Sequence, residues 1–239
     1  MNILLQIIFY FFVSLFTLIF IVQTYLALPR KFKTTYAGKY TPKTLVIVPS
    51  RGTDYSMTDN LKSIKNQKNE KFSIICVVDS EDDPSVKNIK EAGLDYIISN
   101  YRSGGSGKVR AIATALDRFR DFEVYVVADT DIRASPDWLV NLIRPLSLKK
   151  YGLATTFPYF KSVGNFWSKF KTVWGFVGRG MMESKITVFG WGGSMAFRKE
   201  LIEGKIGEFA QDVSDDMAIT RICKERGLQI AYVPEASPE

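Results

Sequence analysis

The chain has 239 residues, 46% hydrophobic and 24% charged, a composition typical of a folded protein and not of a disordered one. Its formal net charge is +7, but the Lys and Arg residues form no dense run and match no nucleic-acid-binding motif, so we expect no nucleic-acid partner. The sequence contains no histidine, which excludes a Ser-His-Asp triad, a His-ligated zinc site and a His general base.

The chain begins with an apolar segment that predicts a transmembrane helix. Residues 3–28 carry no charged side chain. A helix of that length spans roughly 40 Å, enough to cross a bilayer core of about 30 Å. A cleaved signal peptide is the competing interpretation, but it would need a basic start, a shorter apolar run and a small-residue cleavage site.

The flanking charges predict which side of the membrane holds the rest of the chain. Basic residues follow the apolar segment at Arg30, Lys31, Lys33, Lys39 and Lys43. By the positive-inside rule, the remainder is cytoplasmic. The two cysteines, Cys76 and Cys223, lie in apolar patterns and are expected to be reduced core residues, which agrees with a cytoplasmic domain.

From residue 44 onwards, predicted strands and helices alternate. Short apolar, β-branched runs predict buried strands at residues 44–49, 72–78, 96–98 and 124–128. Apolar residues at helical spacing predict helices over 55–67, after Asp83-Pro84, around 109–116 and after Ser135-Pro136. The alternation implies βαβ units, so we predict an α/β fold with a Rossmann-like, mainly parallel sheet flanked by helices.

A less regular half begins at about residue 151. Residues 166–182 read FWSKFKTVWGFVGRGMM and interleave large aromatic residues with Lys169, Lys171 and Arg179. This pattern allows two structures. One is a core helix with a basic outer side, and the other is a basic aromatic helix that lies on a membrane.

Polar groups follow the predicted strands at the points where they end. Pro49, Ser50 and Arg51 end the first strand, Asp79 ends the second, and Asp129 and Asp131 end the fourth. A parallel sheet gathers such strand ends on one edge, where ligands bind in open α/β folds. Two carboxylates one residue apart suit a hard divalent cation, which in turn would suit a substrate that carries phosphates.

Two further segments join this set. Residues 103–108 (SGGSGK) form a Gly-rich loop before a helix, whose free backbone N–H groups favour anions, and Lys108 adds positive charge there. The loop lacks the spacing of a Walker motif. Ser214-Asp215-Asp216 opens a later helix and is explained either by capping and the helix dipole or by catalysis.

Taken in order, these segments resemble the inverting family 2 glycosyltransferases, which have the A-type nucleotide-diphospho-sugar fold. The resemblance covers about residues 44–239, and the apolar N-terminus makes the ceramide glucosyltransferase branch the most similar one. The matching segments are VIVPSRG, Val77-Val78-Asp79, Gly107-Lys108, Ala128-Asp129-Thr130-Asp131, Gly192 to Arg198 and Ser214-Asp215-Asp216.

The resemblance implies a role for each segment. Asp216 would be the general base, with Asp215 beside it. Asp131, with Asp129, would bind Mg²⁺ or Mn²⁺ on the diphosphate of a UDP-sugar. Gly192, Gly193 and Ser194 would border the acceptor. The nucleotide-sugar would be bound by Pro49, Ser50, Arg51, Asp79, Gly107, Lys108 and Asp129.

These roles predict a membrane-anchored, metal-assisted inverting transferase that moves a sugar from a UDP-sugar to the hydroxyl of a lipid or lipid-linked acceptor. Its expected parts are a transmembrane anchor (1–29), a basic juxtamembrane linker (30–43), a nucleotide-binding half (44–150) and an acceptor half (151–239). A carboxylate base and a divalent cation satisfy the chemistry without histidine.

One departure from the family pattern leaves alternatives open. Related membrane members carry a Q-x-x-R-W motif after the last acidic pair, and the sequence printed here contains none before Glu239. A membrane-tethered module that binds a nucleotide-sugar without turnover is therefore one alternative. A sugar nucleotidyltransferase is another, although residues 49–53 lack the G-x-G-x-x-x-R-type loop expected after its first strand.

Overall fold

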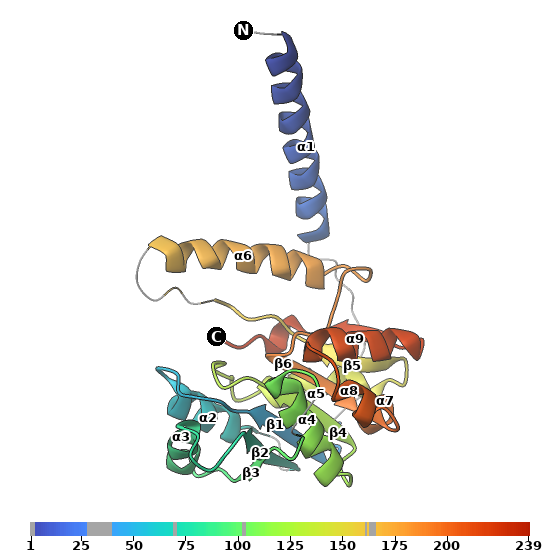
Figure 1. Cartoon of the computed structure of the whole chain (residues 1–239). Coiled ribbons are helices and arrows are strands. Elements are labelled where there is room, and N and C mark those ends of the chain that lie inside the picture. The colour runs from blue at the N-terminus through green and yellow to red at the C-terminus, as the bar shows by residue number, and fades with distance from the viewer. Residues whose placement is uncertain (1–2, 28–39, 69–70, 102–103, 161, 163–165) are drawn as a thin grey trace. The chain divides into compact units, whose positions relative to one another are not determined.

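The computed structural model describes residues 3–27, 40–68, 71–101, 104–160, 162 and 166–239 (Figure 1). The chain divides into two compact units. The helical unit comprises Met1–Lys33 and Phe160–Val188, and the sheet unit comprises Thr34–Tyr159 and Phe189–Glu239. Most of the predicted juxtamembrane linker lies outside the described residues.

The sheet unit is built on one sheet whose described strands follow the order β3-β2-β1-β4-β6-β5-β7. The pairs β1–β2, β1–β4, β2–β3 and β5–β7 are parallel. β6 runs antiparallel to both of its neighbours, β4 and β5. The mainly parallel α/β fold is confirmed. The strands are β1 (Thr44–Pro49), β2 (Phe72–Val78), β3 (Tyr96–Ile98), β4 (Val124–Ala128), β5 (Tyr151–Thr155), β6 (Ser194–Arg198) and β7 (Gln229–Tyr232).

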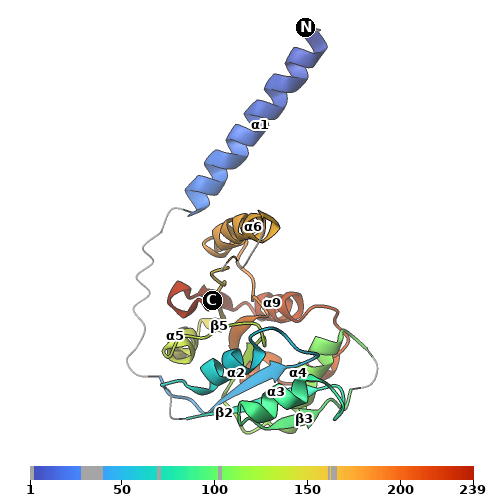
Figure 2. The same ribbon diagram turned by 90° about the vertical axis from the view of Figure 1, so that its left-hand side faces the viewer.

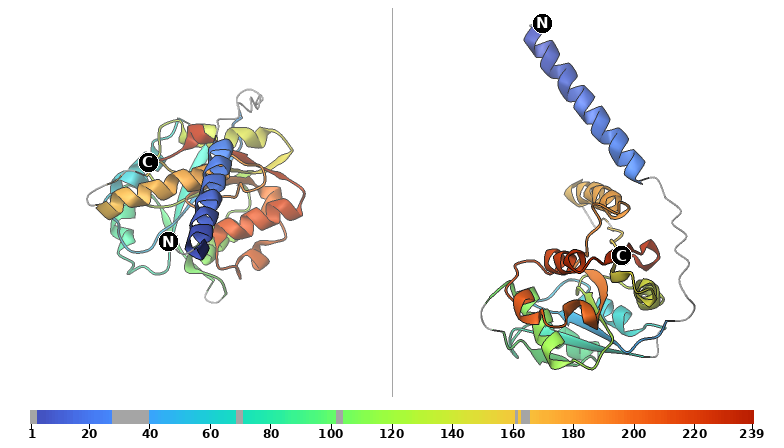
Figure 3. Two further views of the ribbon diagram at one scale, coloured as in Figure 1. Left: turned by 90° about the horizontal axis from the view of Figure 1, so that it is seen from above. Right: turned by 90° about the vertical axis from the view of Figure 1, so that its right-hand side faces the viewer.

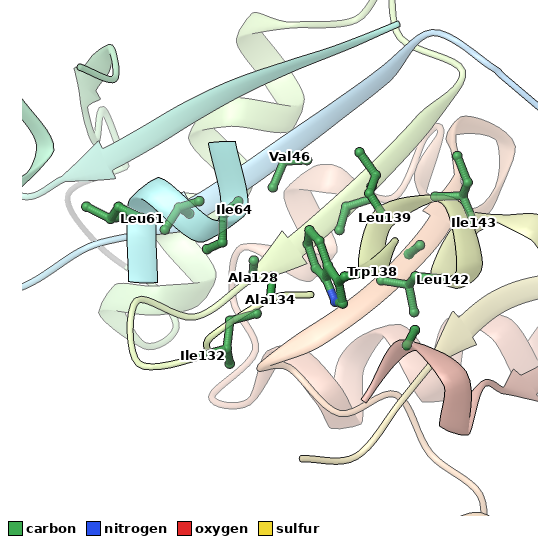
Figure 4. Close-up of a cluster of buried hydrophobic side chains, with 14 of the residues drawn as sticks. Val46, Leu61, Ile64, Ala128, Ile132, Ala134, Trp138, Leu139, Leu142 and Ile143 are labelled. Carbon is green, nitrogen blue, oxygen red and sulfur yellow. The ribbon is translucent and has the colours of Figure 1, made fainter. Parts of the chain in front are cut away.

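Each face of the sheet has its own hydrophobic core, because successive side chains of a strand point to opposite faces. Val46 and Val48 of β1 face α2 (Met57–Lys65), α3 (Ser85–Glu91) and α5 (Trp138–Ile143). Leu45 and Ile47 face α4 (Gly107–Arg118), α7 (Lys199–Ile202), α8 (Ile206–Phe209) and α9 (Asp215–Glu225). Figures 2 and 3 show the same ribbon from other sides, and Figure 4 shows the core around Trp138.

Two short 3₁₀ helices complete the described elements of the sheet unit. η1 (Arg144–Ser147) follows α5, and η2 (Pro234–Ala236) follows β7. The backbone N–H of Arg133 donates a hydrogen bond of 2.7 Å to the carbonyl of Glu239, and the N–H of Glu239 returns one of 3.1 Å. The end of the described chain is thus held beside the segment that follows β4.

The helical unit contains α1 (Ile3–Ala27) and α6 (Phe166–Met182). By length and composition, α1 is the described helix that could cross a membrane, within a stretch from Ile3 to Val22. α6 has the bounds that its sequence predicts. By contacts, α6 groups with α1 and not with the strands on either side of it in the sequence. The predicted division at residue 151 into a nucleotide-binding half and an acceptor half stays a prediction.

Candidate active site

The sheet topology brings the predicted site segments to one edge. β1, β2 and β4 end there at Pro49, Val78 and Ala128, and β6 begins there because it is antiparallel to β4. Ser194 pairs with Ala128 in the sheet, and the backbone N–H of Asp129 donates a 3.1 Å hydrogen bond to the carbonyl of Gly193. The acidic strand end and the Gly192-Gly193 segment are therefore neighbours through the backbone.

Lys108 joins three of these segments. Its Nζ lies 2.7 Å from Oδ1 of Asp129 and 3.3 Å from Oδ2 of Asp215. It also donates a 3.2 Å hydrogen bond to the carbonyl oxygen of Gly192. The side chains of Lys108 and Asp129 are each 31% exposed, and that of Asp215 is 9% exposed. We call Lys108, Asp129 and Asp215 the inner network.

Asp215 is buried and the other two members are partly buried, and this burial dominates the electrostatics of the inner network. Burial raises the pKa of Asp129 to about 6, because the attraction of Lys108 does not compensate for burial and for the neighbouring charges of Asp131 and Asp215. Burial likewise raises the pKa of Asp215. For Lys108, burial favours the neutral amine, but the two carboxylates together outweigh it and raise the pKa.

The Gly-rich loop is fixed to the turn that precedes α9. The N–H of Gly105 donates 2.9 Å to the carbonyl of Ala210, and the N–H of Ser106 donates 3.1 Å to that of Asp212. A Cβ on Gly105 would lie 1.7 Å from the Asp212 carbonyl oxygen, so only glycine fits at this approach. Ser106 accepts a hydrogen bond from Val109 N and caps α4. The loop therefore couples the start of α4 to the position of Asp215.

At the other end of the site, an exposed basic group faces Asp79. The guanidinium of Arg51, which is 80% exposed, lies 3.8 Å from Asp79. The N–H of Gly52 donates 3.0 Å to Asp83, which holds the turn after β1. Ser50 is buried and its hydroxyl donates to the Val48 carbonyl, so it supports this turn from within the protein.

Gly107 opens toward two basic side chains. The nearest neighbours of a Cβ at this position would be the guanidinium nitrogens of Arg51 and Arg110, both 3.9 Å away. The sequence reasoning did not single out Arg110. Arg110 lies two residues after Lys108 in the first turn of α4. Because anions favour the N-terminus of a helix, a second basic residue there is the signal that could have identified it.

Asp215 and Asp216 are adjacent in the sequence, but they face different surroundings. Asp215 joins the inner network, whereas Asp216 accepts hydrogen bonds from the hydroxyl of Ser214 and, at 2.8 Å, from the N–H of Met217. Ser214 precedes α9, but its side chain does not cap the helix as expected. Asp216 also borders a cavity of about 530 Å³, whose other lining residues are Phe189, Met217, Thr220, Arg221, Lys224 and Glu225.

The predicted acceptor segment contains two kinds of position. Gly192 lies against the inner network, since a Cβ there would be 2.3 Å from Oδ2 of Asp215. Ser194 is fully buried, and its hydroxyl accepts a 2.8 Å hydrogen bond from the indole N–H of Trp138. Figure 4 shows this tryptophan within the core. Sequence reasoning missed Trp138, although a buried indole N–H requires a partner and so predicts a polar neighbour.

The donor set fits a divalent cation that is shared with a substrate. Among the described residues, no group of three or more His, Cys, Asp or Glu side chains could hold a metal alone. Asp129 and the exposed Asp131 offer two carboxylates at one strand end. Magnesium sites that use one or two carboxylates are usually completed by substrate phosphates and water, which matches this arrangement.

The family model of glycosyl transferase family 21 matches residues 9–238. The chain belongs to glycosyl transferase family 21. The predicted glycosyltransferase class is thereby confirmed at the level of the family. Family 2 membership, the inverting mechanism and the ceramide glucosyltransferase branch stay predictions.

Solved structures show that this family 21 chain has the A-type glycosyltransferase fold. A mannosyltransferase from Pyrobaculum calidifontis, in complex with GDP-Man and Mn²⁺, is similar with a TM-score of 0.66 and 20% identity, covering 93% of this chain and 63% of that one. Glucosyl-3-phosphoglycerate synthase from Mycobacterium tuberculosis, in complex with Mn²⁺ and UDP-glucose, is similar with a TM-score of 0.54 and 14% identity, covering 83% and 71%. The chain thus spans less than two thirds of the length of the mannosyltransferase.

Proposed function

We propose that this chain is a metal-assisted, inverting glycosyltransferase that transfers a sugar from a UDP-sugar to the hydroxyl of a lipid or lipid-linked acceptor. α1 would anchor it in the membrane, and the basic residues that follow α1 in the sequence support a cytoplasmic sheet unit. The two similar structures, described with nucleotide-sugars and Mn²⁺, support a nucleotide-sugar donor and a divalent cation.

The observation that carries this proposal is the charge imbalance at the sheet edge. Lys108 supplies one positive charge to two poorly hydrated carboxylates, and Asp131 adds a third carboxylate two residues from Asp129. Such a site attracts a further cation, because an uncompensated buried charge is costly. Asp129 and Asp131 would hold Mg²⁺ or Mn²⁺, which would stabilise the negative charge that develops on the leaving diphosphate.

The donor would lie along the edge between Asp79 and Asp129. Asp79 would accept hydrogen bonds from the uracil or ribose, and Arg51 would contribute positive charge near the phosphates. Gly107 lies beside the guanidinium groups of Arg51 and Arg110, which add positive charge at this point of the edge. Lys108 would remain with Asp129 and Asp215 beside the diphosphate.

The geometry supports Asp216 as the general base better than it supports Asp215. It borders the open cavity on α9, whereas Asp215 is buried and paired with Lys108. Asp216 would take the proton of the acceptor hydroxyl as its oxygen bonds to the anomeric carbon of the sugar. The bond from that carbon to the diphosphate oxygen would break at the same time, and UDP would leave with the electron pair.

The test is UDP release by the purified, detergent-solubilised chain from a panel of UDP-sugars, with Mn²⁺, Mg²⁺ or EDTA. We expect turnover of one donor that EDTA abolishes. Asp131→Ala should lower turnover by about 10²- to 10³-fold, the usual size of a lost charge-stabilising group. Asp121→Ala is the matched control, because this exposed aspartate precedes β4 at the opposite edge of the sheet.

Two results would contradict the proposal in different ways. Donor binding without turnover, with metal present, would favour the nucleotide-sugar-binding module. Full activity in both Asp131→Ala and Asp216→Ala would show that these carboxylates have been assigned wrongly.

A further inference from the structure

One face of α6 in the helical unit is apolar and exposed. Phe166 is 70% exposed, Trp167 68% and Phe170 49%. The ring of Trp167 contacts both phenylalanine rings edge to face, with centroids 5.6 Å from Phe166 and 6.3 Å from Phe170. They form a continuous aromatic surface at the start of the helix, and such a surface is costly in water.

This surface continues along the helix. At about 100° per residue, Phe166, Phe170, Val177 and Met181 fall within about 60° of one another, and Trp167 extends the sector to about 100°. Val177 and Met181 are also exposed. We call these five residues the apolar stripe. By the same helical repeat, the opposite sector holds Thr172, Gly175, Phe176 and Arg179, with the buried Met182 at its border.

The charge around the stripe has one sign. Residues 157–182 contain Lys161, Lys169, Lys171 and Arg179 and no acidic residue. Lys169 is exposed, and its direction around the helix axis differs from that of Phe166 by about 60°, which places it at the border of the stripe. A long basic side chain at such a border can keep its ammonium in water while its methylenes cover apolar surface.

We propose that α6 lies in the headgroup layer of the membrane, with the apolar stripe buried against acyl chains and the basic residues near anionic lipid headgroups. An exposed apolar face with basic flanks is the signature of a helix that lies in the interface plane. The stripe belongs to the same compact unit as α1, the described helix of span length. This inference rests on the membrane anchorage by α1 in the proposed function.

The consequence concerns the acceptor. α6 lies in the sequence between β5 and β6, and β6 is preceded by Gly192 and Gly193 beside Asp215. If α6 is bound in the headgroup layer, the chain segments that connect it to β5 and to β6 are both tethered to the lipid surface. An acceptor hydroxyl at headgroup depth could then be reached without extraction of the lipid into water.

The experiment places nitroxide labels on the full chain in liposomes that contain anionic lipid. Single cysteines replace Phe166, Phe170 or Val177 in the stripe, Thr172 on the opposite side, and Phe12 in α1. The native Cys76 and Cys223 are buried, and the unsubstituted chain measures their background labelling. Collision rates with oxygen, which concentrates in the bilayer, and with a polar nickel complex, which stays in water, give the depth of each label.

We expect the ratio of oxygen to nickel collisions to be high at positions 166, 170 and 177 and low at 172, following the helical repeat. Stripe labels accessible to nickel would overturn the inference, as would labels shielded from both reagents, since a protein surface would then cover the stripe. The label at Phe12 separates the two proposals. If it lies in the bilayer while the stripe does not, the anchorage stands and the inference about α6 fails.

Trp167→Ser with Phe170→Ser provides a second measurement. Transfer to a vesicle-bound acceptor should fall relative to the unsubstituted chain, whereas UDP-sugar binding should be unchanged. Equal loss of both would indicate a folding defect, and retention of both would contradict a role for the stripe.

Discussion

Two ion-pair networks in the sheet unit both join basic and acidic side chains, but the pKa shifts among their carboxylates run in opposite directions. In the inner network, Lys108 bridges Asp129 and Asp215 at the sheet edge. In the outer network, between α8 and α9, Arg221 and Lys205 bridge the acidic side chains of Glu208, Asp212 and Glu225. Every side chain of this network is 31–46% exposed. Burial raises the pKa of the inner carboxylates, whereas hydrogen bonds from Arg221 and Lys205 lower the pKa of Glu208.

The difference shows which ion pairs are organised for function. The outer network is more exposed than the inner one, whose members are 9–31% exposed, so its charges attract one another at a smaller desolvation cost and contribute modestly to stability. The inner network keeps carboxylates charged where water is scarce, which stabilises the fold less than apolar packing would. Such an arrangement is expected where a cation and a charged substrate bind.

The largest expected change in stability comes from removing the inner cation. Lys108→Met leaves Asp129 and Asp215 without their shared partner, and we expect the free energy of unfolding to fall by about 2–3 kcal/mol, less than for a fully buried pair because the side chain is 31% exposed. Urea unfolding in EDTA measures it. Lys68→Met is the control, since its pair with Asp137 is 2.8 Å long but more than half exposed on both sides.

A smaller effect is expected from Gly192→Ala. The new Cβ would lie 2.3 Å from the Asp215 carboxylate, so that carboxylate must move from Lys108 at a cost of about 1–3 kcal/mol. Gly207→Ala in α8 serves as the control, because no atom lies within 4 Å of its Cβ position. Equal stability of the two variants would show that Asp215 is free to move.

The two networks should also give opposite pH dependences in metal-free protein. The folded state raises the pKa of Asp129 from 3.8 to about 6. Its contribution to stability is therefore fully present below its ordinary pKa and is lost as the pH rises through about 6, a change of about 1–2 kcal/mol after allowance for exposure. The lowered pKa of Glu208 acts in the other direction, so its contribution is present above its ordinary pKa and is lost in acid.

Urea unfolding at several pH values between about 2.5 and 7 measures both slopes, because the loss from Glu208 falls below its ordinary pKa of 4.5. Asp129→Asn should remove the loss of stability toward neutral pH, and Glu208→Gln should remove the loss toward acid. If Asp129→Asn left the slope between pH 4 and 6 unchanged, burial would not control the inner network.

The smallest effect is expected in the outer network itself. Arg221→Met removes contacts of 2.7 Å to Glu208 and 2.8 Å to Asp212. Because these groups are hydrated, we expect the melting temperature to fall by less than about 3 °C at moderate salt. Calorimetry at low and high salt tests this expectation. A larger loss that does not depend on salt would show that the ion pairs of the outer network are as poorly screened by water as those of the inner network.

Local patterns predicted the strands of the nucleotide-binding half well. The bounds of β1, β2 and β3 agree with the predicted runs, because a buried strand shows its apolar side chains directly in the sequence. The strand ends also placed Asp79 and Asp129 at one edge, since parallel strands end together. The antiparallel insertion of β6 between β4 and β5 was not predicted, because strand order depends on contacts between distant segments.

The residue types and their order are enough to identify the available chemical groups: carboxylates without histidine, a Gly-rich loop with Lys108, and an apolar N-terminal segment. The way in which these groups are used depends on how distant segments pack. Asp215 and Asp216 are indistinguishable as sequence letters, but the rotation of one residue along α9 turns the first toward Lys108 and the second toward the cavity. Ser194 is buried because β6 lies between β4 and β5, and there its hydroxyl accepts a hydrogen bond from Trp138 of a separate helix. Such outcomes depend on the docking of distant elements, which local residue patterns do not encode.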